Sequence, residues 1–598
     1  MSVDSAPKRF AGPVSQLRAP AMLLTFCCVA AALLWIVNTP TVSAIFPNRD
    51  FVFSPYEGHH AIAIRIFIVS FCISFATFSS ASWTGRTLFA LDLVLSYAVI
   101  CGILDLANIV LEKLAGLSYS LHFSAILSGL MGFAIYSFKL LERGRMPVRI
   151  PIEHRAISNK KALLRLAITI TIAGAVSAYV SSMKLEVVEQ MRQLTMLGGI
   201  GPGVFLFLPT LFGQLYLLAI YDVKTAKKAT FKPAVSIIVP AHNEEYIIEN
   251  TINAMDKAAA HYGGDVHILI MNNNSSDNTE TIARETLAKC KSAKGQLINV
   301  PKPGKSNALN AGLEATKTEF LIRVDADTLV GEDNITRAMA YFSDPAVGVV
   351  GGVPIPPGGA LFDRARLLEV LVKHGFYSVA MGAVNGVVGI PGMFVVYRTE
   401  HPRYLGGFVE GMNGEDTDIS LRIGELGFHS VVDPKIRYIS EVPSSYAHMR
   451  EQRMRWFRSV YHISSRCRDL IYSDWMTPRG KIILPYMLIN SGRRAMLVPL
   501  ILFGSLEYGL GFNPQSPIIW QSIVAVTTGA PAIMAVISSL LNGMPRGILC
   551  LPEYLIFRVL RAYFTLESML SILVKQDGEN LETAFKNNVI PEKLLRIA

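Results

Sequence analysis

Two carboxylates two positions apart, Asp325 and Asp327, follow the apolar run 320–324. Side chains at i and i+2 of a strand point to the same side, so both carboxylates would face one direction where the run ends. Oxygen ligands arranged in this way suit a hard divalent cation such as Mg²⁺ or Mn²⁺. An isolated D-x-D pair is more often a surface turn, and its position after a buried run is what favours metal binding here.

A second acidic group, Glu415-Asp416 with Asp418 close behind, follows Gly414 and opens a segment of helical character. A carboxylate placed in this way can take a proton from an attacking hydroxyl, and Asp416 is the candidate general base. Acidic residues also favour the N-terminal end of a helix, so a capped helix start is the structural alternative. Both interpretations can hold together, with Asp418 as a structural residue.

Gln452, Arg455 and Trp456 stand at i, i+3 and i+4, so a helix would present an amide, a guanidinium and an indole on one face. This set can bind a sugar by ring contact and hydrogen bonds. Five arginines are interleaved with Met, Trp, Phe and Tyr around it: Arg450, Arg453, Arg458, Arg466 and Arg468. The mixture predicts an amphipathic helix on a membrane surface, and a simple anchor is the alternative for such a helix.

The elements that must position these residues begin near Lys232, where short β-rich runs alternate with helical ones. This alternation predicts an α/β domain with a mostly parallel sheet. The expected strands are 235–240, 266–271 and 320–324. Polar loops follow them at Asn243-Glu244, Asn272–Asp277 and Asp325–Asp327. Ligands of such sheets bind at the carboxyl ends of the strands, so the three loops predict a nucleotide site.

Apolar runs of membrane-spanning length flank this domain on both sides. They lie near 20–37, 61–83, 87–110, 120–140, 162–182 and 196–221, and again near 481–511, 516–541 and 547–573. Arg493-Arg494 interrupts the first of the later runs. Glu553, Arg558, Arg561 and Glu567 make the last one a candidate pore-lining or re-entrant helix. The composition, 51% hydrophobic and only 17% charged, agrees with a multi-pass α-helical membrane protein.

The expected organisation has four parts. Residues 1–222 form an N-terminal membrane domain with about six helices, given the length of its apolar runs. Residues 223–445 form the α/β domain, and residues 446–480 form interfacial amphipathic helices. Residues 481–598 form a C-terminal membrane domain of two to three helices with a short tail.

Positive charge marks one side of the membrane. The connection 139–165 is rich in it, with Lys139, Arg143, Arg145, Arg149, Arg155, Lys160, Lys161 and Arg165. The connections near 38–60, 111–119 and 183–195 contain little. Because cytoplasmic loops carry an excess of Lys and Arg, the N-terminus and the α/β domain are expected in the cytoplasm. The net charge of +10 is then explained by topology and lipid head groups, and no nucleic-acid partner is expected.

Two charged residues lie inside predicted spans, Arg65 and Asp105. Neighbouring antiparallel helices would bring them together as a structural ion pair, and a role in substrate passage is the alternative. The seven cysteines have no C-x-x-C spacing, and four lie in apolar runs, so neither a disulfide framework nor a zinc site is expected.

Taken together, residues from about Val235 to Trp456 resemble the catalytic domain of the processive family 2 glycosyltransferases, which include the cellulose, chitin and hyaluronan synthases. The resemblance implies a GT-A type domain inserted between membrane helices. It implies that Asp325 and Asp327 contact the donor diphosphate and its Mg²⁺ or Mn²⁺, with Asp327 as the metal ligand. The other expected donor-binding residues are Asn243, Glu244, Asn273 and Lys305, the last in a Lys302-Pro-Gly-Lys305 loop.

The resemblance also assigns the acceptor side. Asp416 would be the catalytic base, and the expected acceptor-binding residues are Glu415, Gln452, Arg455 and Trp456. One catalytic carboxylate suffices for an inverting transferase, because direct displacement on an α-linked donor gives a β-linkage without a second carboxylate as nucleophile.

The expected function is polymerisation of a β-linked polysaccharide from a cytosolic nucleotide sugar, a UDP-sugar in most of the family, with passage of the polymer across the inner or plasma membrane. The partners implied are the donor, the growing polysaccharide and the lipid bilayer; the sequence identifies neither an export partner nor an oligomeric state. Relatives commonly have an Asp-Asp-Gly turn that helps to select uridine. This chain has Asn272-Asn273-Asn274, which leaves another base open.

Two other functions are compatible with parts of the sequence. A non-processive enzyme would add one sugar to a lipid or other membrane acceptor. A transporter would use the soluble domain only to bind a regulatory nucleotide. The complete series of Asp325, Asp327, Asp416 and Gln452 argues against the transporter, since a regulator needs no general base.

Overall fold

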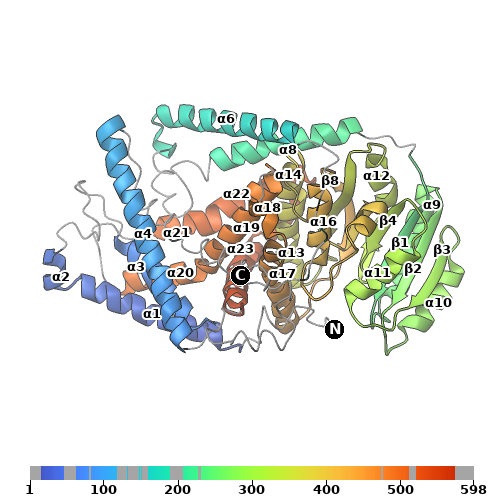
Figure 1. Ribbon diagram of the computed structural model, residues 1–598, viewed down its shortest axis with the longest axis horizontal. Coiled ribbons are helices and arrows are strands. Elements are labelled where there is room, and N and C mark those ends of the chain that lie inside the picture. Colours follow the sequence, from blue (N-terminus) through green and yellow to red (C-terminus); the bar gives the residue numbers. More distant parts are fainter. Residues whose placement is uncertain are drawn as a thin grey trace, which may run out of the picture. The chain divides into compact units, whose positions relative to one another are not determined.

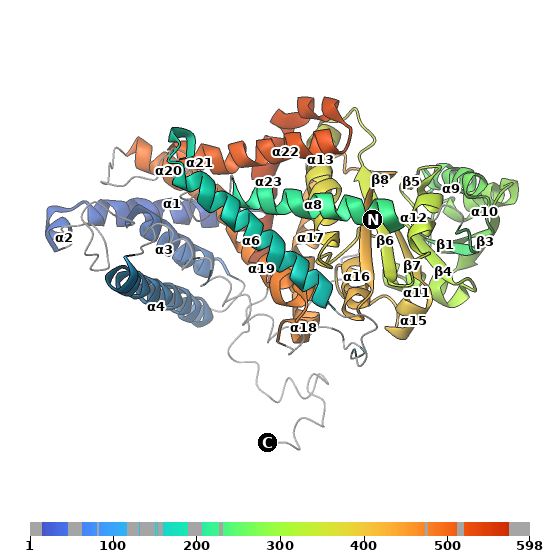
Figure 2. The ribbon, with the colours of Figure 1, turned by 90° about the horizontal axis from the view of Figure 1, so that it is seen from above.

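The computed structural model describes residues 15–45, 62–79, 83–116, 129, 131, 147, 150, 152, 159–188, 206–226, 231–472, 476–510 and 520–572 (Figures 1 and 2). Most of the predicted span 120–140, much of the connection 139–165 and the tail after 575 lie outside these residues. The chain divides into two compact units. Gly144–Gly504 and Ile518–Thr565 make up most of one unit, and Lys8–Arg143, Ser505–Pro517 and Leu566–Ala598 make up the other.

The second unit contains a packed set of apolar helices: α1 (Arg18–Val37), α2 (Pro40–Ile45), α3 (Ile62–Thr77) and α4 (Trp83–Ala115). Phe26 of α1 meets Phe67 of α3 edge to face, with ring centres 5.9 Å apart. Arg65 Nη2 donates to Asp105 Oδ2 at 2.8 Å, and both side chains are buried. The predicted ion pair between the second and third apolar runs is therefore confirmed.

Three helices of the described residues are long and apolar enough to cross a membrane: α1, α4 and α6 (Lys160–Ser182). They coincide with the predicted runs 20–37, 87–110 and 162–182, although α4 begins at Trp83 and is longer than expected. Shorter apolar helices occupy Ala63–Thr77, Phe207–Val223 and Thr527–Leu541. The chain thus has membrane helices, and the total of six N-terminal spans stays a prediction.

The α/β domain is built on an eight-stranded sheet with the order β3-β2-β1-β4-β7-β6-β8-β5. Its strands are β1 (Val235–Ala241), β2 (Val266–Asn272), β3 (Lys294–Asn299), β4 (Phe320–Val324), β5 (Thr328–Val330), β6 (Val347–Ile355), β7 (Phe394–Arg398) and β8 (His429–Ser440). Pairs β1·β2, β1·β4, β2·β3 and β6·β8 are parallel, and β4·β7, β6·β7 and β5·β8 are antiparallel. The sheet is mixed and mostly parallel, as the sequence predicted.

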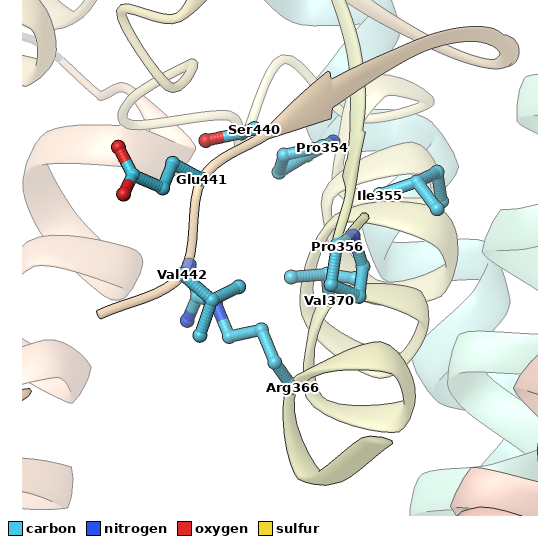
Figure 3. A pocket seen from close by; sticks show the side chains of 8 residues that line it. All are labelled: Pro354, Ile355, Pro356, Arg366, Val370, Ser440, Glu441 and Val442. Atoms are coloured by element: carbon cyan, nitrogen blue, oxygen red, sulfur yellow. The ribbon is translucent and has the colours of Figure 1, made fainter. Parts of the chain in front are cut away.

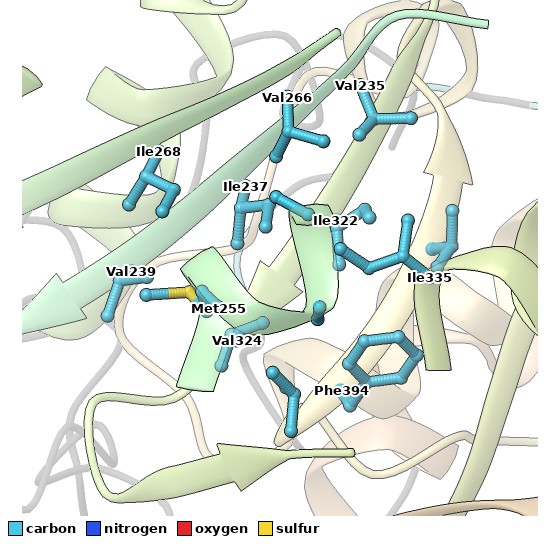
Figure 4. Packing of buried hydrophobic residues seen from close by; sticks show 14 of the residues in the cluster. Val235, Ile237, Val239, Met255, Val266, Ile268, Ile322, Val324, Ile335 and Phe394 are labelled. Atoms are coloured by element: carbon cyan, nitrogen blue, oxygen red, sulfur yellow. The ribbon is translucent and has the colours of Figure 1, made fainter. Parts of the chain in front are cut away.

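Helices cover both faces of this sheet: α9 (Ile248–Tyr262), α10 (Thr279–Lys289), α11 (Lys305–Ala315), α12 (Asn334–Tyr341), α13 (Leu361–Val372), the π-helix η3 (Lys373–Ser378), α14 (Val379–Gly382), α15 (Glu400–Tyr404) and α16 (Glu415–Glu425). Ile237 and Ile322 point to one face, where Met255 of α9 packs on them (Figure 4). Ile238 points to the other, against Leu309 of α11. Burial on both faces explains why the strands are continuously apolar.

Helices continue after the sheet: α17 (Tyr446–Arg466), α18 (Arg468–Tyr472), η4 (Arg479–Ile483), α19 (Leu484–Ala495), α20 (Leu497–Gly509), α21 (Trp520–Val524), η5 (Ala525–Gly529), α22 (Ala530–Leu541), η6 (Pro545–Cys550) and α23 (Leu551–Leu570). The predicted interruption at Arg493-Arg494 coincides with the end of α19, so the first C-terminal apolar run consists of two helices.

The connection that precedes α6 lies against the α/β domain. Arg422 Nη2 of α16 donates to the Ile150 carbonyl at 3.1 Å, and Arg466 Nη1 donates to the Pro147 carbonyl. At the start of α6, Arg165 pairs with Asp222 of α8 (Phe207–Ala226), with Nη1 2.6 Å from Oδ2. The two arginine–carbonyl bonds hold this connection on the α/β domain.

Candidate active site

The D-x-D pair lies at the carboxyl end of β4, where the sequence placed it. Lys305 Nζ donates to Asp325 Oδ2 at 2.8 Å from the first turn of α11. Lys302 in the same loop turns elsewhere, and its Nζ lies 2.7 Å from Glu410 Oε2 in an exposed pair. Of the two lysines in the predicted loop, Lys305 alone meets the D-x-D pair.

Arg323 joins the two acidic motifs, and the sequence analysis missed it. The guanidinium is 1% exposed; its Nη2 lies 2.8 Å from Glu415 Oε1 and 3.6 Å from Asp325 Oδ1. Gly392 makes room for it, since a Cβ there would lie 2.4 Å from Arg323 Cζ. The available signal was an arginine inside the otherwise apolar strand 320–324, because a buried charge requires a partner.

Asp416 is held at the start of α16 by two backbone donors. Its Oδ2 accepts from Gly392 N at 3.0 Å, and its Oδ1 accepts from Thr417 N at 2.7 Å. Burial and the charge of Glu415 raise the pKa of Asp416. Burial also acts to raise the pKa of Glu415, but Arg323 and Lys305 outweigh it and lower that pKa. Glu415 is therefore the ionised partner of Arg323, and Asp416 is the more basic carboxylate.

Acidic side chains meet beside the D-x-D pair. Burial and the charge of Asp325 raise the pKa of Asp327 to about 6. Burial and Asp327 raise the pKa of Glu244 to about 7. Tyr246 donates its hydroxyl hydrogen to Glu441 Oε2 at 2.7 Å, and Glu441 adds to the repulsion at both other carboxylates.

These acidic side chains suit a divalent cation, whose charge would relieve their repulsion. In the described part of the chain, no group of three or more His, Cys, Asp or Glu side chains forms a metal cage by itself. Diphosphate oxygens and water would therefore complete the coordination of a cation at Asp327.

The predicted asparagines order the loops around the crevice. Asn273 Nδ2 donates to the Lys302 carbonyl at 2.7 Å, and its Oδ1 accepts from Gly304 N at 2.7 Å. Asn243, at a φ of +57°, accepts from Ser276 N at 2.8 Å through Oδ1. Asn273 thus fixes the loop that leads to Lys305. Direct contact of Asn243 and Asn273 with the donor stays a prediction.

Gln452, Arg455 and Trp456 lie on α17, as predicted, and all three keep some exposed surface. The interpretation of the neighbouring arginines as lipid-facing is wrong for three of them, because Arg453, Arg458 and Arg466 are buried. Arg453 makes two hydrogen bonds of 2.7 Å to Glu369, and Arg466 Nε lies 2.8 Å from Asp418 Oδ1. These carboxylates come from α13 and α16, which sequence spacing does not connect to α17. Asp418 is structural, as expected.

The turn that presents Glu415 and Asp416 packs on the same helix. A Cβ on Gly414, which has a φ of +91°, would lie 2.8 Å from Ile463 Cδ1 and 3.0 Å from Ser459 Cβ. Asn413 N donates to His462 Nδ1 at 3.2 Å. The structure therefore brings the motif of the candidate base to α17, about one to two turns beyond Trp456 on that helix.

A small pocket lies between the ends of β6 and β8 and helix α13 (Figure 3). It is lined by Pro354, Ile355, Pro356, Arg366, Val370, Ser440, Glu441 and Val442. Glu441 connects it to Tyr246 on the donor side. Arg366 connects it to α17, since its Cζ lies 4.7 Å from the centre of the Trp456 ring. The sequence analysis singled out neither Glu441 nor Arg366, because only the fold brings them to the site.

Comparison with known families agrees with this geometry. The model of glycosyl transferase family 2 matches residues 236–400, and that of glycosyl transferase family group 2 matches residues 320–550. The chain belongs to glycosyltransferase family 2. The two matches together contain both acidic motifs and α17 of this family 2 glycosyltransferase.

Curated relatives match part of the family 2 glycosyltransferase. A probable glycosyltransferase, YdaM, from Bacillus subtilis is 28% identical over 243 residues, covering 39% of this chain and 56% of the relative. The poly-β-1,6-N-acetyl-D-glucosamine synthase of Staphylococcus epidermidis is 24% identical over 257 residues, covering 43% of this chain and 60% of the relative. The chain spans less than two thirds of the length of these relatives.

Two solved structures also resemble the family 2 glycosyltransferase. The mannosyltransferase PcManGT from Pyrobaculum calidifontis, in complex with GDP-Man and Mn²⁺, has a TM-score of 0.38 and 18% identity over 58% of this chain and 97% of its own. Glucosyl-3-phosphoglycerate synthase from Mycobacterium tuberculosis, with Mn²⁺ and UDP-glucose, has a TM-score of 0.29 and 18% identity, covering 41% of this chain and 83% of its own.

Proposed function

We propose that this family 2 glycosyltransferase is an inverting, processive synthase that extends a β-linked polysaccharide and passes it through its own helices. The observation that carries the proposal is the bridge from Asp325 through Arg323 to Glu415, beside Asp416. It joins a site suited to a donor diphosphate with the helix start that carries a candidate base. The turn that carries the base packs through Gly414 against α17, which is followed by the C-terminal apolar helices.

The reaction proposed is a single displacement. Asp416 accepts the proton of an acceptor hydroxyl while the oxygen of that hydroxyl forms a bond to the anomeric carbon of the donor. The bond from that carbon to the diphosphate breaks, and the nucleoside diphosphate leaves with the electron pair. Lys305 and Arg323 carry positive charge near the leaving group. A divalent cation held by Asp327 with Asp325 would supply the further positive charge that stabilises the diphosphate.

The donor is proposed to be a sugar linked to a nucleoside diphosphate, with UDP as the first candidate from the family resemblance. Two structural neighbours are complexes with GDP-Man and with UDP-glucose, each with Mn²⁺. The amide of Asn273 is engaged with its own loop, and the side chain of Asn272 donates to Asn299 Oδ1 at 2.8 Å. The donor panel described below therefore decides which nucleobase the donor carries.

The catalytic domain is proposed to lie in the cytoplasm. The carbonyls of Pro147 and Ile150 accept hydrogen bonds from Arg466 and Arg422, so the connection before α6 is on the same side as the domain. That connection is rich in Lys and Arg, which is typical of cytoplasmic loops. A bacterial inner membrane or a plasma membrane fits this orientation.

One observation favours the non-processive alternative, a transferase with a lipid acceptor. An apolar pocket between α8, η3 and α22 has the form of a site for an acyl or prenyl chain; it is lined by Pro209, Gly213, Tyr216, Leu217, Phe376, Met534, Ile537 and Leu541. A lipid acceptor would make the product a single-sugar adduct and would require the added lipid for turnover.

Nucleotide release tests these proposals. The purified protein in nanodiscs is incubated with Mn²⁺ or Mg²⁺ and a panel of UDP- and GDP-sugars, and the product is sized by gel filtration. Asp416→Asn should abolish release, whereas Glu410→Gln, in the exposed pair with Lys302, serves as the matched control. Release by Asp416→Asn at the wild-type rate would exclude Asp416 as the base. Single-sugar adducts that form only with added lipid would reject the processive synthase and support the non-processive transferase with a lipid acceptor.

A further inference from the structure

A buried carboxylate at the centre of the large unit is surrounded by three guanidinium groups. Glu369 of α13 is 3% exposed and pairs with Arg366 at 2.7 Å, Arg453 at 2.7 Å and Arg561 at 2.9 Å. Burial acts to raise the pKa of Glu369, but Arg453, Arg561 and Arg366 outweigh it and hold the pKa well below its usual range. Glu369 is therefore ionised, and it neutralises one of three cations.

Three further cations lie beside this cluster. Lys373 follows Glu369 by one helical turn, Arg558 precedes Arg561 by one turn on α23, and Arg494 lies over the Phe457 ring at 5.8 Å. Among the residues that the structure describes, none of these three forms an ion pair. Among the described residues, Glu369 is the one carboxylate that pairs with any of these six cations. We call them the basic cluster: Arg366, Lys373, Arg453, Arg494, Arg558 and Arg561.

Two members of the basic cluster, Arg366 and Arg453, are buried, and the cluster has unused donors. The Nε groups of Arg453, Arg494, Arg558 and Arg561 are buried without a hydrogen-bond acceptor. Lys373 keeps exposed surface, and burial lowers its pKa to about 8. Buried charges and donors are costly unless they are paired. The imbalance therefore indicates that an anion from outside the chain belongs here.

The position of the basic cluster indicates which anion. Arg366 lines the pocket next to Glu441 and, with Arg453, contacts the Trp456 ring at 4.7 and 4.8 Å. Arg453 also lies 5.0 Å from the Phe557 ring, so the cluster extends from the acceptor helix to α23. The guanidinium groups of Arg366 and Arg453 lie over the Trp456 ring, so donors and the ring are presented together. A carboxylate on the sugar would meet their donors, often in bidentate pairs.

We propose that the basic cluster binds the acidic groups of the glycan, so that the polymer made by this chain carries carboxylates, as a glycan with uronic-acid residues does. The proposal rests on the proposed function, because it assumes that the acceptor is a glycan chain. It adds the chemical class of that chain.

Binding to the full-length protein in nanodiscs of neutral lipid tests this proposal without turnover. The probes are a tetrasaccharide of β-linked glucuronate and cellotetraose, compared by isothermal titration. We expect the acidic probe to bind about tenfold or more tightly, because hydrogen bonds between a carboxylate and a guanidinium are stronger than those of a neutral hydroxyl. Lys373→Gln and Arg558→Gln should each reduce that preference several-fold, since neither cation is needed to pair Glu369. Lys373→Arg should retain it.

The control is Arg364→Gln, whose guanidinium pairs with Glu553 outside the basic cluster. Equal affinity for the two tetrasaccharides, or an unchanged preference in both Gln variants, would overturn the inference. Displacement of the acidic probe by stoichiometric pyrophosphate would assign the basic cluster to phosphate, and binding that requires phosphatidylglycerol would assign it to lipid head groups; either outcome rejects the glycan. Nucleotide release that depends on Asp416, measured on the same preparations, separates failure of this inference from failure of the proposed function.

Discussion

Arg323 and Glu415 form a pair with Nη2 and Oε1 2.8 Å apart, although they stand on β4 and α16, far apart in the sequence. Arg323 Nη2 also lies 3.6 Å from Asp325 Oδ1. One buried guanidinium therefore fixes the distance between the D-x-D pair and the helix that carries Asp416. It stabilises Glu415 as an anion and leaves Asp416 as the group of raised pKa.

Arg323→Lys should lower the rate of nucleotide release by on the order of 10²-fold, because a lysine keeps the charge but cannot reach both carboxylates in the same geometry. The donor KM should change less than kcat, because the substitution displaces α16 with Asp416 and leaves the D-x-D pair after β4 in place. Circular dichroism and thermal unfolding check that the variant folds. A variant with wild-type kcat would contradict the role of Arg323 as the link between the two motifs.

The acid limb of the pH–rate profile should report Asp416. A general base must be deprotonated, so kcat/KM is lost as pH falls through its pKa, which burial and Glu415 raise above the ordinary Asp value. Glu415→Gln removes the negative charge beside Asp416. It also removes the carboxylate that neutralises Arg323, so the guanidinium stabilises the Asp416 anion more strongly. Both changes lower the pKa of Asp416. The acid limb should then move to lower pH. A limb that stays in place or moves to higher pH would show that another group titrates.

Divalent cation binding should weaken as pH falls through about 6, the pKa of Asp327. The cation and the proton compete for the same carboxylate, so protonation releases the metal. Electron paramagnetic resonance of Mn²⁺ with the nucleoside diphosphate present, at pH values on both sides of 6, measures this competition. Asp327→Asn should lose the pH dependence together with most of the affinity. Tight Mn²⁺ binding to that variant would place the metal elsewhere.

Lys305→Ala should raise the donor KM more than it lowers kcat, because Lys305 lies beside the D-x-D pair and is proposed to contribute positive charge to the donor diphosphate site. The matched control is Lys294→Ala, whose ammonium lies 2.8 Å from Asp265 Oδ1 in an exposed pair on the edge strand. Initial rates over a donor concentration series separate the two constants. An equal rise of the donor KM in both variants would contradict the assignment of Lys305 to the donor site.

Asn273→Ala should disorder the loop that leads to Lys305. The side chain holds Lys302 and Gly304 through hydrogen bonds of 2.7 Å, and each lost buried bond costs about 1–3 kcal/mol. We expect a lower unfolding temperature and a higher donor KM. Hydrogen exchange of the Gly304 amide gives the local readout, and unchanged protection there would contradict the loop-ordering role.

Local patterns were enough to predict the strands that precede the candidate donor-binding loops, and the residues at their ends. The run 320–324 is β4 without any shift of its ends, and Asp325 follows it as expected. Gln452 and Trp456 share α17 because helical spacing is a local property. The Arg65–Asp105 pair could also be predicted, since adjacent antiparallel helices leave few partners for a buried charge.

Partners that come from distant segments could not be predicted in this way. Arg453 was assigned to the lipid surface because its pairing with Glu369 depends on how α13 packs on α17. Glu441 stands at the end of β8, and only the pairing of β8 with β5 brings it near Asp327. The antiparallel strand β7 between β4 and β6 has no local signature that distinguishes it from a parallel one.

The length of the product at low donor conversion tests the central claim of a processive synthase most directly. The protein in nanodiscs would be given a large excess of the active nucleotide sugar and stopped when a small fraction is consumed. The account predicts long chains from the first time point, with none in Asp416→Asn, because the growing polymer stays bound between additions. A distribution of short products that lengthens evenly with time, or single-sugar adducts alone, would contradict it.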